Sequence, residues 1–216
     1  MKNKPSLKPL FIVRDYFYQD PDSIRDLAKT MKYSHRSTLT GYMTNVAFHE
    51  KGIRQRVARM LGAKITRWDI SPGGYNGIFY GGFSAGPFKE RPSVHSDVPY
   101  DDLTILVYLT PDLPSNCGTS FWEHKATGLT SAPTAKDAHD LGINISKLRR
   151  RLERDAGNKN CWIEIDRIGY RYNRMVAFAS GMLHSATRHF GSDLESGRVF
   201  QAFRIGIDWS SFQLAK

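Results

Sequence analysis

Residues 95–109 read HSDVPYDDLTILVYL, and this stretch decides the fold. Its last seven residues, 103–109, are mostly apolar and β-branched or aromatic, which predicts a buried strand. A loop over residues 98–102 separates this strand from the motif His95-Ser96-Asp97. In an extended chain the side chains at positions i and i+2 point to the same face, about 6.5 Å apart. We therefore expect His95 and Asp97 to be able to bind one ion together.

A third metal ligand must come from elsewhere in the chain. His184 follows the apolar run 175–178 and the turn residues Ser180 and Gly181, so a further strand would deliver it. Two imidazoles and one carboxylate on one side of a divalent metal leave the other side open, an arrangement typical of non-haem Fe(II) oxygenases. His189 competes for this position, and we favour His184 because it directly follows the strand and turn. The alternative is a set of hydrogen-bonded or surface residues.

Residues 198–207 predict one long strand near the end of the chain. Alternation places Arg198 and Arg204 on one face with Phe200 and Ala202. An arginine close to a metal suits a bidentate grip on a carboxylate. The alternative is that one or both arginines lie on the exposed face of an edge strand. Alternation places Val199, Phe203, Ile205 and Ile207 on the opposite face.

In their order along the chain, these motifs resemble the Fe(II)/2-oxoglutarate-dependent dioxygenase superfamily, in particular its prolyl-hydroxylase-like branch. The resemblance covers about residues 65–208. The opening residues 11–17, with Asp20 and Pro21, are similar to the leader of small bacterial members that have no assigned substrate. The resemblance rests on His95-Ser96-Asp97, the strand 103–109, Gly118-Thr119-Ser120-Phe121, residues 173–178, His184 and Arg198.

The resemblance implies a mainly β fold with flanking helices, a double-stranded β-helix or jelly roll of the cupin-like kind. It also implies that His95, Asp97 and His184 bind Fe(II) at one open end of this fold. Related halogenases carry a small residue in place of the carboxylate. The presence of Asp97 therefore favours hydroxylation over halogenation.

The same resemblance implies 2-oxoglutarate as cosubstrate, with its far carboxylate held by Arg198 or Arg204. Arg198 follows the distal histidine at the interval usual in the family. Family members often carry Ser or Thr two residues after that arginine, and Phe200 stands there instead, so the choice between the two arginines stays open. Tyr80 and Tyr108 are candidate hydroxyl donors to the cosubstrate, with core aromatic residues as the alternative.

The 216 residues predict a single domain able to bury a substantial core. We expect helical N-terminal support over about residues 1–62 and a barrel over about 63–208. The first helix starts with Asp20 as cap and Pro21 at its first position, and the second stops at Gly62. Both helices are expected to buttress the larger sheet.

An insertion over about residues 124–168 interrupts the barrel. Residues 129–138 have the composition of a loop, and a basic helix follows from Asn144 to Gly157. In the family such insertions often form a lid that selects substrate, which makes Arg149 and Arg150 candidate lid residues. The alternative is a solvated basic helix that covers the edge of the barrel.

The net charge of +10 could attract nucleic acid, an acidic carrier protein or an anionic small substrate. Basic residues are not clearly interleaved with aromatic residues, so the sequence does not favour nucleic acid. No apolar run is long enough to span a membrane, and residues 1–4 do not lead into an apolar segment. With Cys117 and Cys161 as the only cysteines, we expect reduced thiols in a cytoplasmic protein.

Together these patterns predict an oxygenase that uses Fe(II), 2-oxoglutarate and O2 to hydroxylate an amino acid, a peptide or protein side chain, or a small metabolite. The alternatives are a cupin-like metal-binding isomerase and a non-catalytic binding module, because a fold does not determine a function. A dioxygenase that modifies nucleic acid is a third reading. The oligomeric state does not follow from the sequence.

Overall fold

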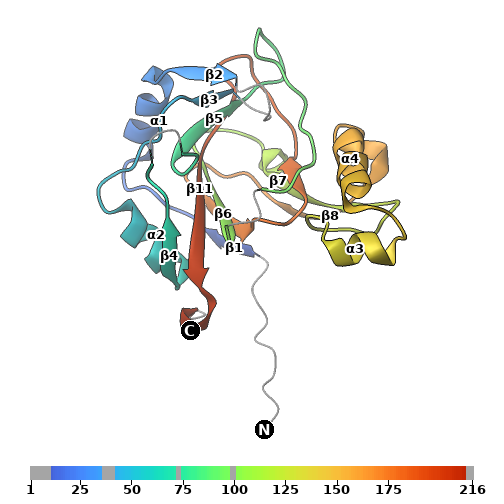
Figure 1. The fold of residues 1–216 in the computed structure, drawn as a ribbon. Helices are drawn as coiled ribbons and strands as arrows, with labels where there is room; N and C mark the ends of the chain where they lie inside the picture. Colours follow the sequence, from blue (N-terminus) through green and yellow to red (C-terminus); the bar gives the residue numbers. More distant parts are fainter. Residues whose placement is uncertain (1–10, 36–41, 72–73, 98–100, 213–216) are drawn as a thin grey trace.

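A computed structural model describes residues 11–35, 42–71, 74–97 and 101–212. Residues 1–4 and most of the loop predicted after Asp97, residues 98–100, lie outside the described residues. Two antiparallel sheets form the expected jelly roll (Figure 1). The small sheet has the order β10 (His184–Ala186), β7 (Thr119–His124) and β8 (Trp162–Ile168). The large sheet has the order β1 (Phe11–Arg14), β9 (Met175–Ala179), β6 (Leu103–Tyr108), β11 (Arg198–Asp208), β5 (Ile78–Gly82), β3 (Tyr42–Thr44) and β2 (Tyr33–His35), with β4 (Lys64–Trp68) also paired to β11.

Strand β11 lies at the centre of the large sheet. One of its edges pairs with β6, and the other pairs first with β5 and then with β4. Val199, Phe203 and Ile205 are buried in the core on the helical side of the sheet, as the alternation predicts. The other face of β11 therefore points toward the small sheet, and this face contains the two arginines.

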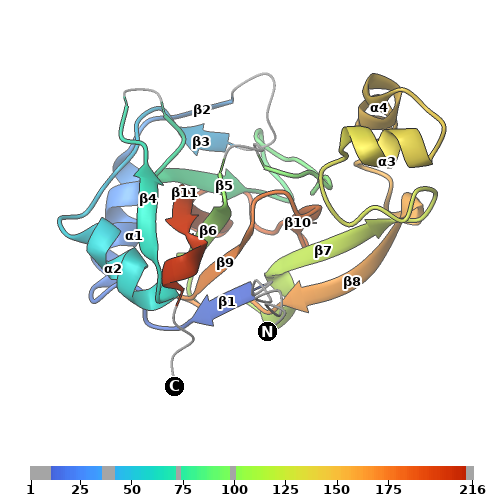
Figure 2. The same cartoon turned by 60° about the horizontal axis from the view of Figure 1, so that its bottom comes forward.

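Two helices, α1 (Pro21–Thr30) and α2 (Ile53–Leu61), cover the outer face of the large sheet (Figures 1 and 2). Asp20 caps α1 by accepting a hydrogen bond from the Ser23 amide at 3.1 Å. Gly62 ends α2 in the left-handed conformation, with a φ of 67°. The buried residues of both helices pack with residues of strands β6 and β11 in one cluster.

A second core fills the space between the two sheets. Phe121 of β7 packs there with Val176 and Phe178 of β9. Gly118, just before β7, allows the chain to pass close to the end of β8: a Cβ at this position would lie 1.8 Å from the carbonyl oxygen of Ile168. The glycine of the Gly118-Thr119 motif is thus required by packing.

The segment around Asn173, which precedes β9, anchors the start of the described chain. Asn173 accepts a hydrogen bond from the Tyr18 amide and donates one to the Tyr18 carbonyl, both at 2.8 Å. Arg174 makes two hydrogen bonds to Asp15, at 2.7 and 3.1 Å. These contacts join the N-terminal residues to the turn that begins β9.

The insertion differs from the prediction in two places. Residues 129–138, predicted as a loop, contain the start of helix α3 (Ala135–Asp140), capped reciprocally by Thr134 and Asp137. This helix buries only Ala138, so the sequence offers no apolar stripe that would reveal it. The insertion also contains β8, which belongs to the small sheet.

The basic helix is α4 (Ile145–Asp155), which starts after Asn144 as predicted and ends two residues before Gly157. Leu148 and Leu152 are its buried residues. Figure 2 shows α3 and α4 at the far end of β7 and β8, on the opposite side of the molecule from α1 and α2. None of the helices in the described part of the chain combines the length and apolar character of a membrane span.

Candidate metal centre

The three predicted ligands come together where the chain before β6 runs beside β10. His95 and His184 form an isolated antiparallel bridge, with two backbone hydrogen bonds of 3.0 and 2.8 Å. The amide of Asp97 donates to the carbonyl of Ser180 at 2.9 Å. The H-x-D motif therefore lies on a short extended segment held by the distal histidine's own strand, and not on a regular strand of the sheet.

His95, Asp97 and His184 each offer one ligand atom, and these atoms lie within 4.8 Å of one another. Nε2 of His184 is 3.7 Å from Oδ2 of Asp97. The Nδ1 atoms lie 3.0 Å from the Ser93 carbonyl oxygen for His95 and 2.9 Å from the Met182 carbonyl oxygen for His184. A carbonyl only accepts, so each Nδ1 carries the hydrogen and each Nε2 presents a lone pair.

The electrostatic environment keeps Asp97 and His184 in the states that bind a cation. Burial alone would raise the pKa of Asp97, but the charges of His184 and Arg204 outweigh burial and hold this pKa far below its usual range. Thr104 donates to Oδ2 of Asp97 at 2.5 Å, and Arg204 Nη2 donates to Oδ1 at 2.9 Å. Burial, followed by the charge of His95, lowers the pKa of His184 to about 4. Asp97 is thus anionic and His184 neutral at neutral pH, as metal binding requires.

The donor set fits a divalent transition metal. Two imidazole nitrogens and one carboxylate oxygen suit Fe(II) and related ions, and they leave coordination positions open. All three residues line a cavity of about 830 Å³. The open side of such a metal would therefore face a space large enough for a cosubstrate and a substrate.

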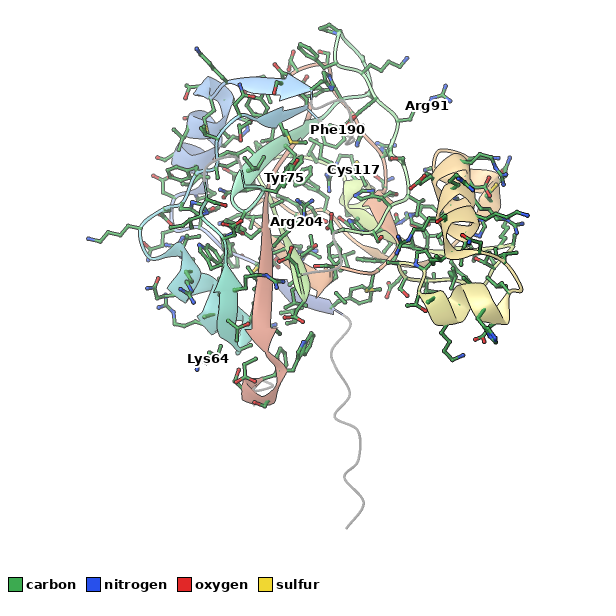
Figure 3. All side chains as sticks on the ribbon, in the orientation of Figure 1. Lys64, Tyr75, Arg91, Cys117, Phe190 and Arg204 are labelled. Atoms are coloured by element: carbon green, nitrogen blue, oxygen red, sulfur yellow. The ribbon has the colours of Figure 1, made fainter. Side chains whose placement is uncertain are left out.

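Both candidate arginines line this cavity, but their surroundings differ. Arg204 is paired with Asp97 and lies over the ring of Tyr75, at 5.5 Å from the ring centre (Figure 3). Arg198 is 2% exposed, and no described carboxylate forms an ion pair with it. Its guanidinium carbon lies 4.4 Å from the ring centre of Phe200, and its Nε has no hydrogen-bond partner among the described residues. A buried guanidinium without a counter-ion is costly, and a bound anion would offset that cost.

The two candidate tyrosines occupy different depths. Tyr80 lines the cavity and stacks on Phe200, with ring centres 5.1 Å apart. Tyr108 is fully buried and is not among the lining residues; its hydroxyl is 2.7 Å from Oγ1 of Thr119. Arg198 lies over the Tyr108 ring, at 5.3 Å from the ring centre. Tyr108 therefore packs against Arg198 and does not itself reach the cavity.

Of the two candidate lid residues, Arg149 lines the cavity and Arg150 does not. Two lining residues that sequence reasoning missed are Thr104, which bonds Asp97, and Thr119, whose hydroxyl is 3.5 Å from Nη2 of Arg198. The sequence contains a signal that could have identified Thr104, because it is a hydroxyl residue within the apolar run 103–109. His189 also lines the cavity, outside the group of three ligands.

Residues 86–200 match a sequence family described as "Family of unknown function (DUF6445)". The chain belongs to this family. The matched part of this DUF6445 protein runs from the segment before His95 into β11, and so it contains the three candidate ligands and Arg198. None of the curated proteins matches the sequence.

Solved structures show what the DUF6445 fold is similar to. HygX from Streptomyces hygroscopicus, with nickel and 2-oxoglutarate bound, is 11% identical, with a TM-score of 0.54 over 92% of this chain and 83% of HygX. A second HygX structure also contains hygromycin B and matches with the same TM-score of 0.54 at 10% identity. SnoK, a non-heme alpha ketoglutarate dependent carbocyclase from nogalamycin biosynthesis, is 11% identical, with a TM-score of 0.47 over 92% of this chain and 79% of SnoK. The likeness to HygX confirms the jelly-roll fold class.

Proposed function

We propose that this DUF6445 protein is a non-haem Fe(II)- and 2-oxoglutarate-dependent oxygenase. The observation that carries the proposal is the meeting of two features in one cavity. His95, Asp97 and His184 place their ligand atoms within 4.8 Å of one another, and the buried Arg198 lines the same space without a described counter-ion. The fold shared with HygX, which holds nickel and 2-oxoglutarate, supports the choice of metal type and cosubstrate.

In this proposal Nε2 of each histidine and one carboxylate oxygen of Asp97 hold Fe(II). The iron supplies the redox chemistry that divides O2 between 2-oxoglutarate, which becomes succinate and CO2, and a substrate C–H bond, which becomes C–OH. Arg204 and Thr104 orient the Asp97 carboxylate through their hydrogen bonds of 2.9 and 2.5 Å. The ligand carboxylate is then positioned before any metal binds.

Arg198 is the residue that we assign to the far carboxylate of 2-oxoglutarate. Arg204 already neutralises Asp97, whereas the guanidinium of Arg198 is buried with free donor capacity. The guanidinium packs on the rings of Phe200 and Tyr108, which favours a fixed bidentate geometry. Tyr80 stacks on Phe200, and both side chains line the cavity beside Arg198.

Substrate enters beside the insertion in this proposal. Arg149, Leu152 and Glu153 of α4 line the cavity, so this helix forms one wall of the substrate space and acts as the lid. The substrate class stays open among an amino acid, a peptide or protein side chain and a small metabolite. We further propose that the barrel, its helical support and the insertion act as one domain.

The test is an anaerobic titration of metal-free protein with Fe(II) and then with 2-oxoglutarate, monitored through the metal-to-ligand charge-transfer band of the chelate. We expect a band that His95→Ala and Asp97→Ala abolish. Arg198→Gln is expected to weaken 2-oxoglutarate about 10- to 100-fold, because a charged hydrogen-bond partner contributes about 1.5–3 kcal/mol. Arg150→Gln, outside the cavity, is the matched control and should bind as the wild type does.

The other outcomes are equally informative. Folded protein that retains iron but shows no band would refute the 2-oxoglutarate assignment and favour a cupin-like metal protein. Folded protein that binds no iron would favour a binding module.

A further inference from the structure

A histidine that is not one of the three candidate ligands lies in the same cavity. His189 belongs to the segment between β10 and β11, and its side chain is 9% exposed. It lines the cavity together with Arg198. The function proposed above gives it no role, so its position needs an explanation.

The strand register places His189 beside Arg198. Gly82 of β5 is paired with Arg198 of β11, and paired residues of an antiparallel ladder point to the same face. A Cβ on Gly82 would lie 2.9 Å from both Cδ2 and Nε2 of His189. The imidazole therefore occupies the space that a side chain at position 82 would fill, on the face of the sheet from which the Arg198 side chain extends.

The hydrogen bonding of His189 leaves one ring nitrogen for a ligand. Nδ1 lies 3.2 Å from the carbonyl oxygen of Glu90, which only accepts, so Nδ1 carries the hydrogen of the neutral ring. Among the described residues, the hydrogen bond of the His189 ring is the one made by Nδ1, so in the neutral ring Nε2 carries a lone pair. A carboxylate only accepts hydrogen bonds. Nε2 must therefore gain a hydrogen, as the second on the ring, before it can donate a hydrogen bond to a bound carboxylate.

The charges around His189 keep its ring neutral near neutral pH as long as no anion is bound beside it. Burial, followed by the positive charge of Arg198, lowers the pKa of His189 to about 4. In the described part of the chain, the charged groups that face the ring are Arg198 from β11 and Glu90 from the segment after β5, with Glu90 Oε1 3.8 Å from Nδ1. Gly82 of β5 brings no charge. An anion on Arg198 would cancel the repulsion and, with Glu90, stabilise the imidazolium.

We propose that His189 binds the far carboxylate of 2-oxoglutarate together with Arg198, taking up a proton as this carboxylate binds and donating a hydrogen bond to it from Nε2. This inference rests on the proposed function of the cavity. It adds a second donor beside Arg198 and couples cosubstrate binding to proton uptake. Binding strengthens as pH falls from the pKa of His189 in the complex toward its pKa of about 4 in the free protein.

The experiment is isothermal titration of anaerobic, Ni(II)-saturated protein with 2-oxoglutarate between pH 6 and 8.5. Repeating it in buffers of different ionisation enthalpy counts the protons taken up. We expect the wild type to take up a proton, with up to about tenfold weaker binding per pH unit as pH rises toward the pKa of His189 in the complex. His189→Gln keeps a neutral donor and should lose both the uptake and the pH dependence. His139→Gln, at a histidine whose side chain is 90% exposed, is the matched control.

A second variant moves the ring without changing its chemistry. Gly82→Ala places a methyl group against the imidazole, so 2-oxoglutarate should bind more weakly although His189 is still present. If the wild type binds 2-oxoglutarate without proton uptake and His189→Gln binds equally well at every pH, the role of His189 is wrong and the proposed function stands. If Ni(II)-loaded wild type binds no 2-oxoglutarate, both proposals are wrong.

Discussion

Replacing Thr104 with valine tests whether the fold itself positions Asp97. The substitution conserves shape on β6 and removes the hydroxyl that donates to Oδ2 of Asp97 at 2.5 Å. Both side chains are buried, with Thr104 1% and Asp97 7% exposed. The valine side chain offers no donor in place of the hydroxyl, and Arg204 is then the remaining described side chain that donates a hydrogen bond to the carboxylate.

The expected size of the effect follows from the charge of the acceptor. A hydrogen bond to an ionised group contributes about 1.5–3 kcal/mol, more than a neutral pair. Thr104 Oγ1 also lies 3.1 Å from Oγ of Ser180, so the single substitution disturbs a second contact. A double-mutant cycle with Asp97→Asn separates the two, because its coupling energy reports only the interaction between positions 104 and 97.

The assay is urea unfolding of metal-free protein at pH 7 for the wild type, the two single variants and the double variant. We expect Thr104→Val to lower the free energy of unfolding, with a coupling energy of about 1.5–3 kcal/mol. Thr66→Val, at an exposed position of β4, is the matched control and should stay within about 0.5 kcal/mol of the wild type. A coupling energy below about 0.5 kcal/mol would refute the reasoning, since it would mean that the Thr104 hydroxyl does not hold the carboxylate.

Two further predictions concern packing and acid stability. Gly118→Ala should lower the free energy of unfolding by at least about 1–3 kcal/mol, because its Cβ would lie 1.8 Å from the carbonyl oxygen of Ile168. Thermal unfolding checks this against Gly157→Ala, where nothing lies within 4 Å of the added Cβ, and equal melting temperatures would contradict it. Because the pKa of Asp97 is lower in the folded protein than the usual 3.8, its ionised form stabilises the fold above pH 3.8, and this contribution is lost as pH falls through the folded pKa. Asp97→Asn should therefore lose less stability than the wild type between pH 5 and 2.5 in urea unfolding, and parallel losses would count against the assignment.

Local patterns in the sequence predicted much of the architecture. The apolar run 103–109 gave a strand, the alternation of residues 198–207 matched the two faces of β11, and Asp20 and Gly62 marked helix ends. Each of these signals depends on neighbours within a few positions, where side-chain alternation and capping act directly. The same local reasoning missed α3 and the role of β8. Ala138 is the only buried residue of α3, and Ile163 and Ile165 of β8 are 45% and 46% exposed. Neither element therefore shows the regular alternation of buried and exposed residues that a sequence pattern would reveal.

The sequence by itself determined the candidate ligand types, their order along the chain and the strand that carries His184. Only the tertiary structure decided that Arg204 pairs with Asp97, that Arg198 has no described carboxylate partner, and that His189 lies against Gly82. These relations depend on the register between β5, β6 and β11 and on the path of the chain after β10. Register and chain path are set by packing between residues far apart in the sequence, and the charge and protonation of each buried group follow from the neighbours that this packing supplies.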